Sequence, residues 1–157
     1  MKEAYIMMGM AVMLIIAYLS FVIVRRKEIP PSVSQTVFDL PKRWIWSAFL
    51  GLEAWLIAPG FIEKTSDNFQ FLAFFTVVAL GVLGVYPLFK GEKNTIHNVA
   101  GVAACVFSQA VIALERPSLL LSWIFFGLLM GLKEGREKWC FFAEVICFVS
   151  VYMYCFI

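Results

Sequence analysis

The chain has 157 residues, of which 62% are hydrophobic and 15% are charged, with a formal net charge of +2. A soluble domain is about half apolar and about a quarter charged, so this chain has too little polar surface to cover a globule in water. The composition excludes a soluble globular protein and predicts one whose solvent is lipid.

Six apolar runs along the chain predict six transmembrane helices. A helix of about 20 apolar residues spans the roughly 30 Å hydrocarbon core of a bilayer. The predicted spans are Tyr5–Val24, Trp44–Ile62, Phe69–Phe89, Thr95–Leu114, Leu119–Leu132 and Trp139–Ile157. The short connections make sequence neighbours antiparallel neighbours in space. The predicted fold class is all-α, a polytopic membrane helical bundle in a single domain over residues 1–157.

The fifth span is the shortest of the six. Its 14 residues reach only about 21 Å at a rise of 1.5 Å per residue. The helix is longer if Pro117 and Ser118 begin it and if Lys133 ends it with its ammonium group at the interface. The alternative is a re-entrant segment that leaves five true spans, but the distribution of basic residues favours six.

The basic residues predict the orientation. With strictly alternating spans, ten of the 13 Lys and Arg residues fall in loops on one side and three on the other. Because cytoplasmic loops carry such an excess, we expect the 25–43 segment in the cytoplasm and both termini outside. The predicted location is a bacterial inner (cytoplasmic) membrane. Topology accounts for the basic residues, so we expect no nucleic-acid partner.

The 25–43 segment is the longest polar stretch of the chain. A Pro-Pro pair stops the first helix, and Ser32 or Ser34 is placed to cap a short interfacial helix over residues 32–40. We expect its apolar face to lie on the bilayer surface. That face consists of Val33, Val37, Phe38 and Leu40. The simplest interpretation is a capped connector.

A second interpretation of this segment is a lipid-headgroup or substrate site. Its serine, amide and acidic side chains lie close in sequence to basic residues that attract anionic headgroups. The residues of such a site would be Arg25, Arg26, Ser32, Ser34, Gln35, Asp39 and Arg43.

The stretch IPPSVSQTVFDLPKRWIWSAFLGLE, residues 29–53, resembles the Ser-[Ile/Val]-Ser segment after the first span of Frag1/DRAM/Sfk1-type membrane proteins. It is still more similar to small uncharacterised bacterial multi-pass proteins that carry a later ExxxxH pattern, here Glu92 and His97. The resemblance implies a six-span protein that handles lipids or lipid anchors, with no catalytic residues to carry over. It places the Ser-x-Ser loop outside, whereas the charges place it in the cytoplasm.

Three ionisable residues are predicted within the bilayer or at its edge. Glu53 lies near the middle of the second span, Glu144 about five residues into the sixth, and His97 in the first turn of the fourth. Such residues are costly in a membrane and are functional candidates. We expect both carboxyl groups to point into the bundle, burial to favour the protonated form of Glu53, and His97 to lie within reach of Glu144.

These ionisable residues have two interpretations. One is a proton or cation relay that leads from the cytoplasm. The other is that the two carboxyl groups form hydrogen bonds between helices, which are worth about 0.6 to 2 kcal/mol in membrane proteins.

Small residues at helical spacing predict close packing of three spans. Gly81 and Gly84 lie in the third span, and Gly127 and Gly131 form a GxxxG pair in the fifth, through which a homo-oligomer would form. A substrate cleft along the fourth span is the alternative there. Its face of small and polar residues consists of His97, Gly101, Ala104 and Ser108, with Gln109 beside them.

Motifs for catalysis, metals and cofactors have no support in the sequence. The single histidine excludes bis-histidine haem ligation, and the four cysteines contain no CxxC pair. Cys140, Glu144 and Cys147 share a helix face, but isolated cysteines are common in apolar helices, so we expect no metal. The leading hypothesis is a lipid- or partner-binding membrane protein. The alternatives are a small oligomeric channel or proton-coupled transporter that uses Glu53, His97 and Glu144, and a lipid-modifying enzyme.

Overall fold

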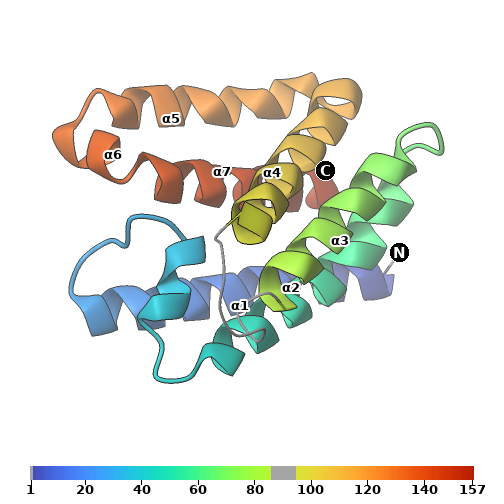
Figure 1. The fold of residues 1–157 in the computed structure, drawn as a ribbon. Helices are drawn as coiled ribbons and strands as arrows, with labels where there is room; N and C mark the ends of the chain where they lie inside the picture. Colours follow the sequence, from blue (N-terminus) through green and yellow to red (C-terminus); the bar gives the residue numbers. More distant parts are fainter. Residues whose placement is uncertain (1, 86–94) are drawn as a thin grey trace.

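The computed structural model describes residues 2–85 and 95–157, and its regular structure within these ranges is helical (Figure 1). The predicted all-α fold class is confirmed. The elements are α1 (Lys2–Arg26), the 3-10 helix η1 (Ser34–Phe38), α2 (Arg43–Lys64), α3 (Gln70–Val85), α4 (Thr95–Glu115), the 3-10 helix η3 (Pro117–Leu121), α5 (Ser122–Met130), α6 (Lys133–Glu137) and α7 (Trp139–Phe156).

Four of the described helices, α1, α2, α4 and α7, are long and apolar enough to cross a membrane. In lipid the backbone must satisfy its own hydrogen bonds, which is why such apolar runs become unbroken helices. The apolar helices Gln70–Val85 and Pro117–Met130 are shorter. The last four residues of the predicted third span lie outside the described residues, as does Glu92 of the ExxxxH pattern.

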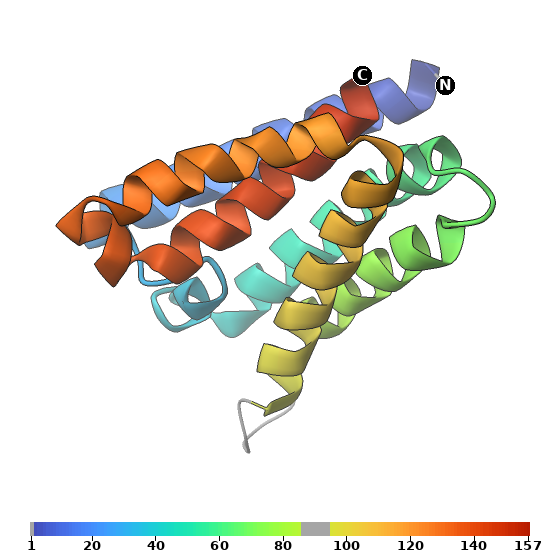
Figure 2. The ribbon, with the colours of Figure 1, turned by 90° about the horizontal axis from the view of Figure 1, so that it is seen from above.

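Contacts between five helices close a ring, and α2 also packs against α7 across it; Figure 2 shows these helices from the side. In this ring α1 packs against α2, α2 against α3, α3 against α4, and α4 against α7, which returns to α1. The remaining long element, α5, packs on the outside of α7, and α6 joins the two. Apolar side chains therefore face the inside of the bundle as well as its outer surface.

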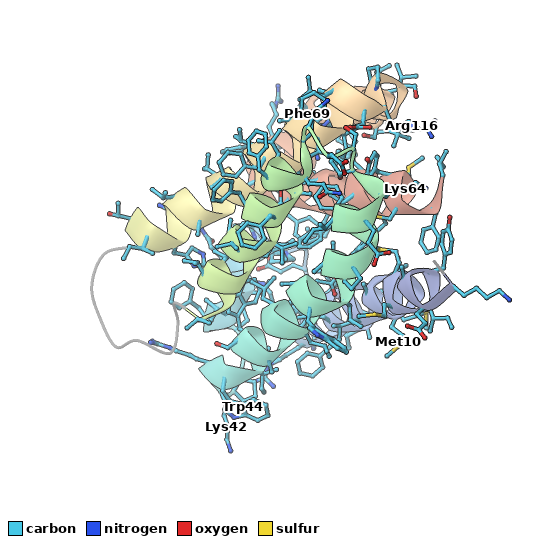
Figure 3. All side chains as sticks on the ribbon, turned by 90° about the vertical axis from the view of Figure 1, so that its right-hand side faces the viewer. Met10, Lys42, Trp44, Lys64, Phe69 and Arg116 are labelled. Carbon is cyan, nitrogen blue, oxygen red and sulfur yellow. The ribbon has the colours of Figure 1, made fainter. Side chains whose placement is uncertain are left out.

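The ends of the helices gather at two opposite ends of the molecule. Figure 3 shows Lys64, Phe69 and Arg116 at one end, and Lys42 and Trp44 at the other. The termini lie at the first of these ends, where the rings of Tyr5 and Phe156 stack at 6.3 Å between centroids. We call this end the terminal end and the opposite one the loop end.

Polar contacts hold the terminal end together. The backbone amide and the hydroxyl of Ser66 donate hydrogen bonds to the Glu115 carboxylate, which joins the α2–α3 connection to the end of α4. The Lys64 Nζ donates to the carbonyl of Cys155 at 3.3 Å, and the Tyr154 hydroxyl donates to the carbonyl of Lys64 at 3.2 Å. These contacts fix the end of α7 against the end of α2.

The fifth predicted span runs alongside α7 from the terminal end to the loop end, and its backbone does not reverse (Figures 1 and 2). Pro117 stands in the first turn of η3, as expected. Two hydrogen bonds attach α5 to the ring. The Ser122 and Ser150 hydroxyls lie 2.9 Å apart, and the Trp123 indole donates to the Gln109 side chain at 2.8 Å.

Close helix packing is confirmed at one of the predicted glycines. A Cβ atom added to Gly84 would lie 3.0 Å from the Cβ of Leu50, so Gly84 allows α3 to approach α2 closely. Gly81 and Gly127 have no such neighbour within 4 Å and face open space in the described chain. Close packing through those two glycines would therefore need a partner from outside the described structure.

Candidate functional site

The ring of helices encloses an apolar cavity between α2, α3, α4, α7 and residues 33–34. Its volume is about 580 Å³, including its opening. Much of its wall is aliphatic or aromatic, including Leu50, Ile57, Leu80, Leu83, Phe148 and Val151.

The cavity extends along the helices from the loop end towards the middle of the bundle. On α2 its wall runs from Trp46 to Ile57, which corresponds to about 16 Å at 1.5 Å per residue. The deeper polar residues of the wall already have partners, because Thr76 and Ser108 donate their hydroxyl protons to backbone carbonyls of their own helices. The deep part of the cavity therefore offers an apolar surface.

Glu144 is the polar group at the loop end of the cavity. Its Oε2 atom accepts hydrogen bonds from the backbone amides of Val33, at 2.5 Å, and Ser34, at 3.2 Å. Its Oε1 atom accepts from the thiol of Cys140, at 3.8 Å, and the Ser34 hydroxyl also interacts with the carboxylate. Among the described residues that line the cavity, Glu144 is the one with a charged side chain.

The 32–38 segment is folded so that its amides meet this carboxylate. The Gln35 amide donates to the Ser32 Oγ at 3.0 Å, which is the expected capping role of that serine. The Thr36 hydroxyl lies 2.5 Å from the Tyr18 hydroxyl of α1. One turn of 3-10 helix, Ser34–Phe38, stands where a short helix over 32–40 was expected.

The expected orientation of this segment's apolar face was wrong. Val33, Val37 and Leu40 are 2%, 3% and 9% exposed, so they are buried inside the bundle and do not lie on the bilayer surface. Phe38 alone of the four projects outward, with 68% exposed. The physical reason is that the segment closes the loop end of the ring, where its apolar side chains find neighbours on the helices.

Of the charged residues expected at a headgroup site, some form ion pairs and others are exposed. The Arg26 guanidinium binds Asp39 at 2.5 Å and Glu28 at 2.7 Å, which joins the end of α1 to the far end of the segment. The hydrogen bond from Arg26 also lowers the pKa of the exposed Glu28 carboxyl. Arg25 and Arg43 are exposed to the surroundings. None of these five residues lines the cavity.

Glu53 is fully buried, with 0% exposed, so its expected inward orientation is confirmed. The Tyr152 hydroxyl of α7 donates a hydrogen bond to its Oε1 atom. Its Oε2 atom has no hydrogen-bond partner in the described part of the chain. The carboxyl group therefore links α2 to α7 and keeps one unused polar atom in an apolar interior.

Glu53 and Glu144 lie at different depths in the bundle. Tyr152 and Glu144 are eight residues apart on α7, or about 12 Å along the helix axis. His97 is half-buried in the first turn of α4. The hydrogen bonds described for Glu144 come from Val33, Ser34 and Cys140, so its carboxylate faces the 32–34 segment, and its expected pairing with His97 stays a prediction.

The cysteines are free thiols, and two of them, Cys105 and Cys147, line the cavity from α4 and α7. No group of three or more His, Cys, Asp or Glu residues in the described ranges is arranged to hold a metal ion. Sequence reasoning identified Glu53 and Glu144 but missed the partners of both. Neither Tyr152 nor the amides of the 32–34 segment carries a motif that marks them as partners.

Comparisons of the chain with protein-family models, with curated proteins and with solved structures found no match. Function is therefore argued from the cavity and its polar groups.

Proposed function

We propose that the chain is an integral membrane protein that binds an amphipathic lipid in its central cavity. The observation that carries this proposal is the form of the cavity, which has a long apolar wall and one polar end made by Ser34 and Glu144. A lipid has the same division into an apolar chain and a polar head. Binding buries the chain against Leu50, Ile57 and Val151 and leaves the head at the loop end.

The accompanying topology is six membrane crossings in the inner (cytoplasmic) membrane, with the loop end in the cytoplasm and both termini outside. The positive-inside rule supports this orientation, since ten of the 13 basic residues belong to the predicted cytoplasmic loops. The unreversed path of η3 and α5 supports a complete fifth crossing. The resemblance to Frag1/DRAM/Sfk1-type proteins implies the same number of spans and lipid handling.

Cysteine labelling tests the topology. Gln35 and Asn68 are exposed at opposite ends of the molecule, so each is replaced by cysteine in a variant whose four native cysteines are serine or alanine. A membrane-impermeant maleimide applied to intact cells should label Asn68→Cys and should reach Gln35→Cys only after lysis. The reverse pattern would show that the orientation is inverted.

Native mass spectrometry of the purified full chain tests the binding. We expect a lipid to remain bound to the wild type and to be lost from Ala104→Phe, because Ala104 lines the cavity and is 6% exposed. Val102→Phe is the matched control, since Val102 lies on the same helix but is 63% exposed. Gly101→Leu, which also enters the cavity, serves as a second blocking variant if Ala104→Phe unfolds.

Retention of lipid by both blocking variants, with melting temperatures equal to that of the wild type, would contradict binding in the cavity. The same spectra report the oligomeric state. If Gly127 and Gly131 form the contact of a homo-oligomer, the oligomer should be lost in Gly127→Leu, because this glycine faces open space within one chain.

A second candidate function is proton-coupled transport, and the buried Glu53 favours it. A carboxyl group that is fully buried with one unpartnered oxygen is costly to keep in a membrane. Reconstituted liposomes with an internal pH dye would report a proton flux. That flux should disappear in Glu53→Gln, in which the Tyr152 hydrogen bond is retained. Liposomes as proton-tight as protein-free ones would exclude this function.

A further inference from the structure

The chemistry of the lipid headgroup follows from the charges around the cavity, and this inference rests on the lipid-binding function proposed above. We infer that the cavity selects an amphiphile with a cationic head that donates hydrogen bonds, such as a primary ammonium, and that Glu144 is its specificity-determining acceptor. The alternative head is an anion such as a carboxylate. The contacts of Glu144 and of the neighbouring basic residues distinguish the two.

The two oxygens of Glu144 are occupied unequally. Two backbone amides donate to Oε2, at 2.5 and 3.2 Å, so that atom has little capacity left. Oε1 accepts from the Cys140 thiol at 3.8 Å, and a thiol is a weak donor. The Ser34 hydroxyl also interacts with this carboxylate. Because Glu144 also lines the cavity, Oε1 is the acceptor available to a headgroup there.

The basic residues at the loop end do not neutralise the charge of Glu144 inside the cavity. No Lys or Arg in the described ranges lines it. Arg26 is engaged with Asp39 and Glu28, and Lys27, the nearest in sequence to the 32–34 segment, is exposed. An anionic head would therefore bring a second negative charge beside Glu144 without a cation to balance it.

A primary ammonium fits the same position. It carries three N–H donors and a positive charge. One donor meets Oε1 of Glu144. The Ser34 hydroxyl contacts this carboxylate and lies 3.1 Å from the Ser32 hydroxyl, and its remaining lone pair provides a second acceptor beside the cavity. The alkyl chain then follows the apolar wall towards Ile57. Charge complementarity of this kind discriminates between ligands of equal apolar surface.

The test compares dodecylamine, dodecanol and dodecanoate, which share one chain length and differ in their heads. Binding is measured by microscale thermophoresis with the full chain in nanodiscs of zwitterionic lipid, and empty nanodiscs correct for partitioning. We expect dodecylamine to bind about tenfold or more tightly than dodecanoate, because hydrogen bonds to charged groups are the stronger ones.

Glu144→Gln should reduce this ratio by about tenfold and leave dodecanol binding unchanged, because the amide keeps an oxygen for the Val33 and Ser34 donors. Glu137→Gln is the matched control. It removes an exposed acid at the same end, 59% exposed in its side chain, and should keep the wild-type ratio. An equal fall of this affinity ratio in both variants would show that surface charge causes the preference, and would overturn the inference.

Cys140→Ala tests the role of Oε1 without changing the contacts of the 32–34 segment. It removes the weak donor from Oε1 without touching the amides on Oε2, so dodecylamine should bind at least as tightly as to the wild type. Equal binding of dodecylamine and dodecanoate to the wild type, or an unchanged ratio in Glu144→Gln, would refute the headgroup inference while leaving lipid binding intact. Failure of all three probes to bind would instead refute the proposed function.

Discussion

Replacing Tyr152 with phenylalanine tests how much the buried carboxyl group depends on its one described donor. Phenylalanine keeps the ring and its stacking on Phe148, at 6.2 Å between centroids, and removes only the hydroxyl. Both oxygens of Glu53, which is 0% exposed, are then without a described hydrogen bond. The change therefore isolates the polar contact from the packing around it.

The expected loss of stability has two parts. A hydrogen bond between membrane helices contributes on average about 0.6 kcal/mol and at most about 1.7. Leaving its buried acceptor unsatisfied costs about 1 to 3 kcal/mol. We expect a decrease of about 2 kcal/mol in the free energy of unfolding, or about thirtyfold in the equilibrium constant. Reversible unfolding by dodecyl sulfate in mixed micelles, followed by circular dichroism, measures this change.

Tyr154→Phe is the matched control, because this tyrosine is also buried but its hydroxyl donates to a neutral backbone carbonyl, that of the partly buried Lys64, at 3.2 Å. We expect it to cost well under half as much. The double variant Glu53→Leu with Tyr152→Phe removes both partners and should recover most of the loss. An equal loss of stability for the two tyrosine variants, or no recovery in the double variant, would show that the unpaired Glu53 carboxyl group does not destabilise the bundle.

Two further predictions concern packing and charge. Gly84→Ala should lower the melting temperature, because its new Cβ would meet Leu50 at 3.0 Å, whereas Gly81→Ala, with nothing within 4 Å, should leave it unchanged or raise it slightly. The lowered pKa of Glu28, held by Arg26, stabilises the fold above the ordinary titration range of glutamate. The difference in stability between wild type and Glu28→Gln should therefore decrease as the pH falls from that range and vanish below the lowered pKa of Glu28, and a difference that persists in stronger acid would contradict this contact.

The helices were the part of the fold that the sequence predicted best. The predicted spans Trp44–Ile62 and Thr95–Leu114 correspond to helices Arg43–Lys64 and Thr95–Glu115. The differences arise because the helices continue past the apolar run into charged residues, whose long side chains reach polar surroundings. The inward orientation of Glu53 was also predictable, since an acid facing lipid is too costly.

The contacts between distant parts of the chain could not be predicted from the sequence. Val33 and Glu144 are 111 residues apart in sequence, and no motif marks a backbone amide as the partner of a particular carboxylate. The apolar pattern of the 32–40 segment fitted either a bilayer surface or a bundle interior equally well. Only the position of α7 beside it decides between them.

The order of the chain gives α7 a particular role during synthesis. Glu53 precedes its donor Tyr152 by 99 residues, and the wall that α7 supplies closes the ring last. Until α7 is inserted, the Glu53 carboxyl group has no Tyr152 donor and the amides of residues 33 and 34 have no Glu144 acceptor. A nascent chain that stalls before Trp139 would thus lack the α7 wall of the cavity and both polar contacts, because α7 supplies Glu144 and Tyr152.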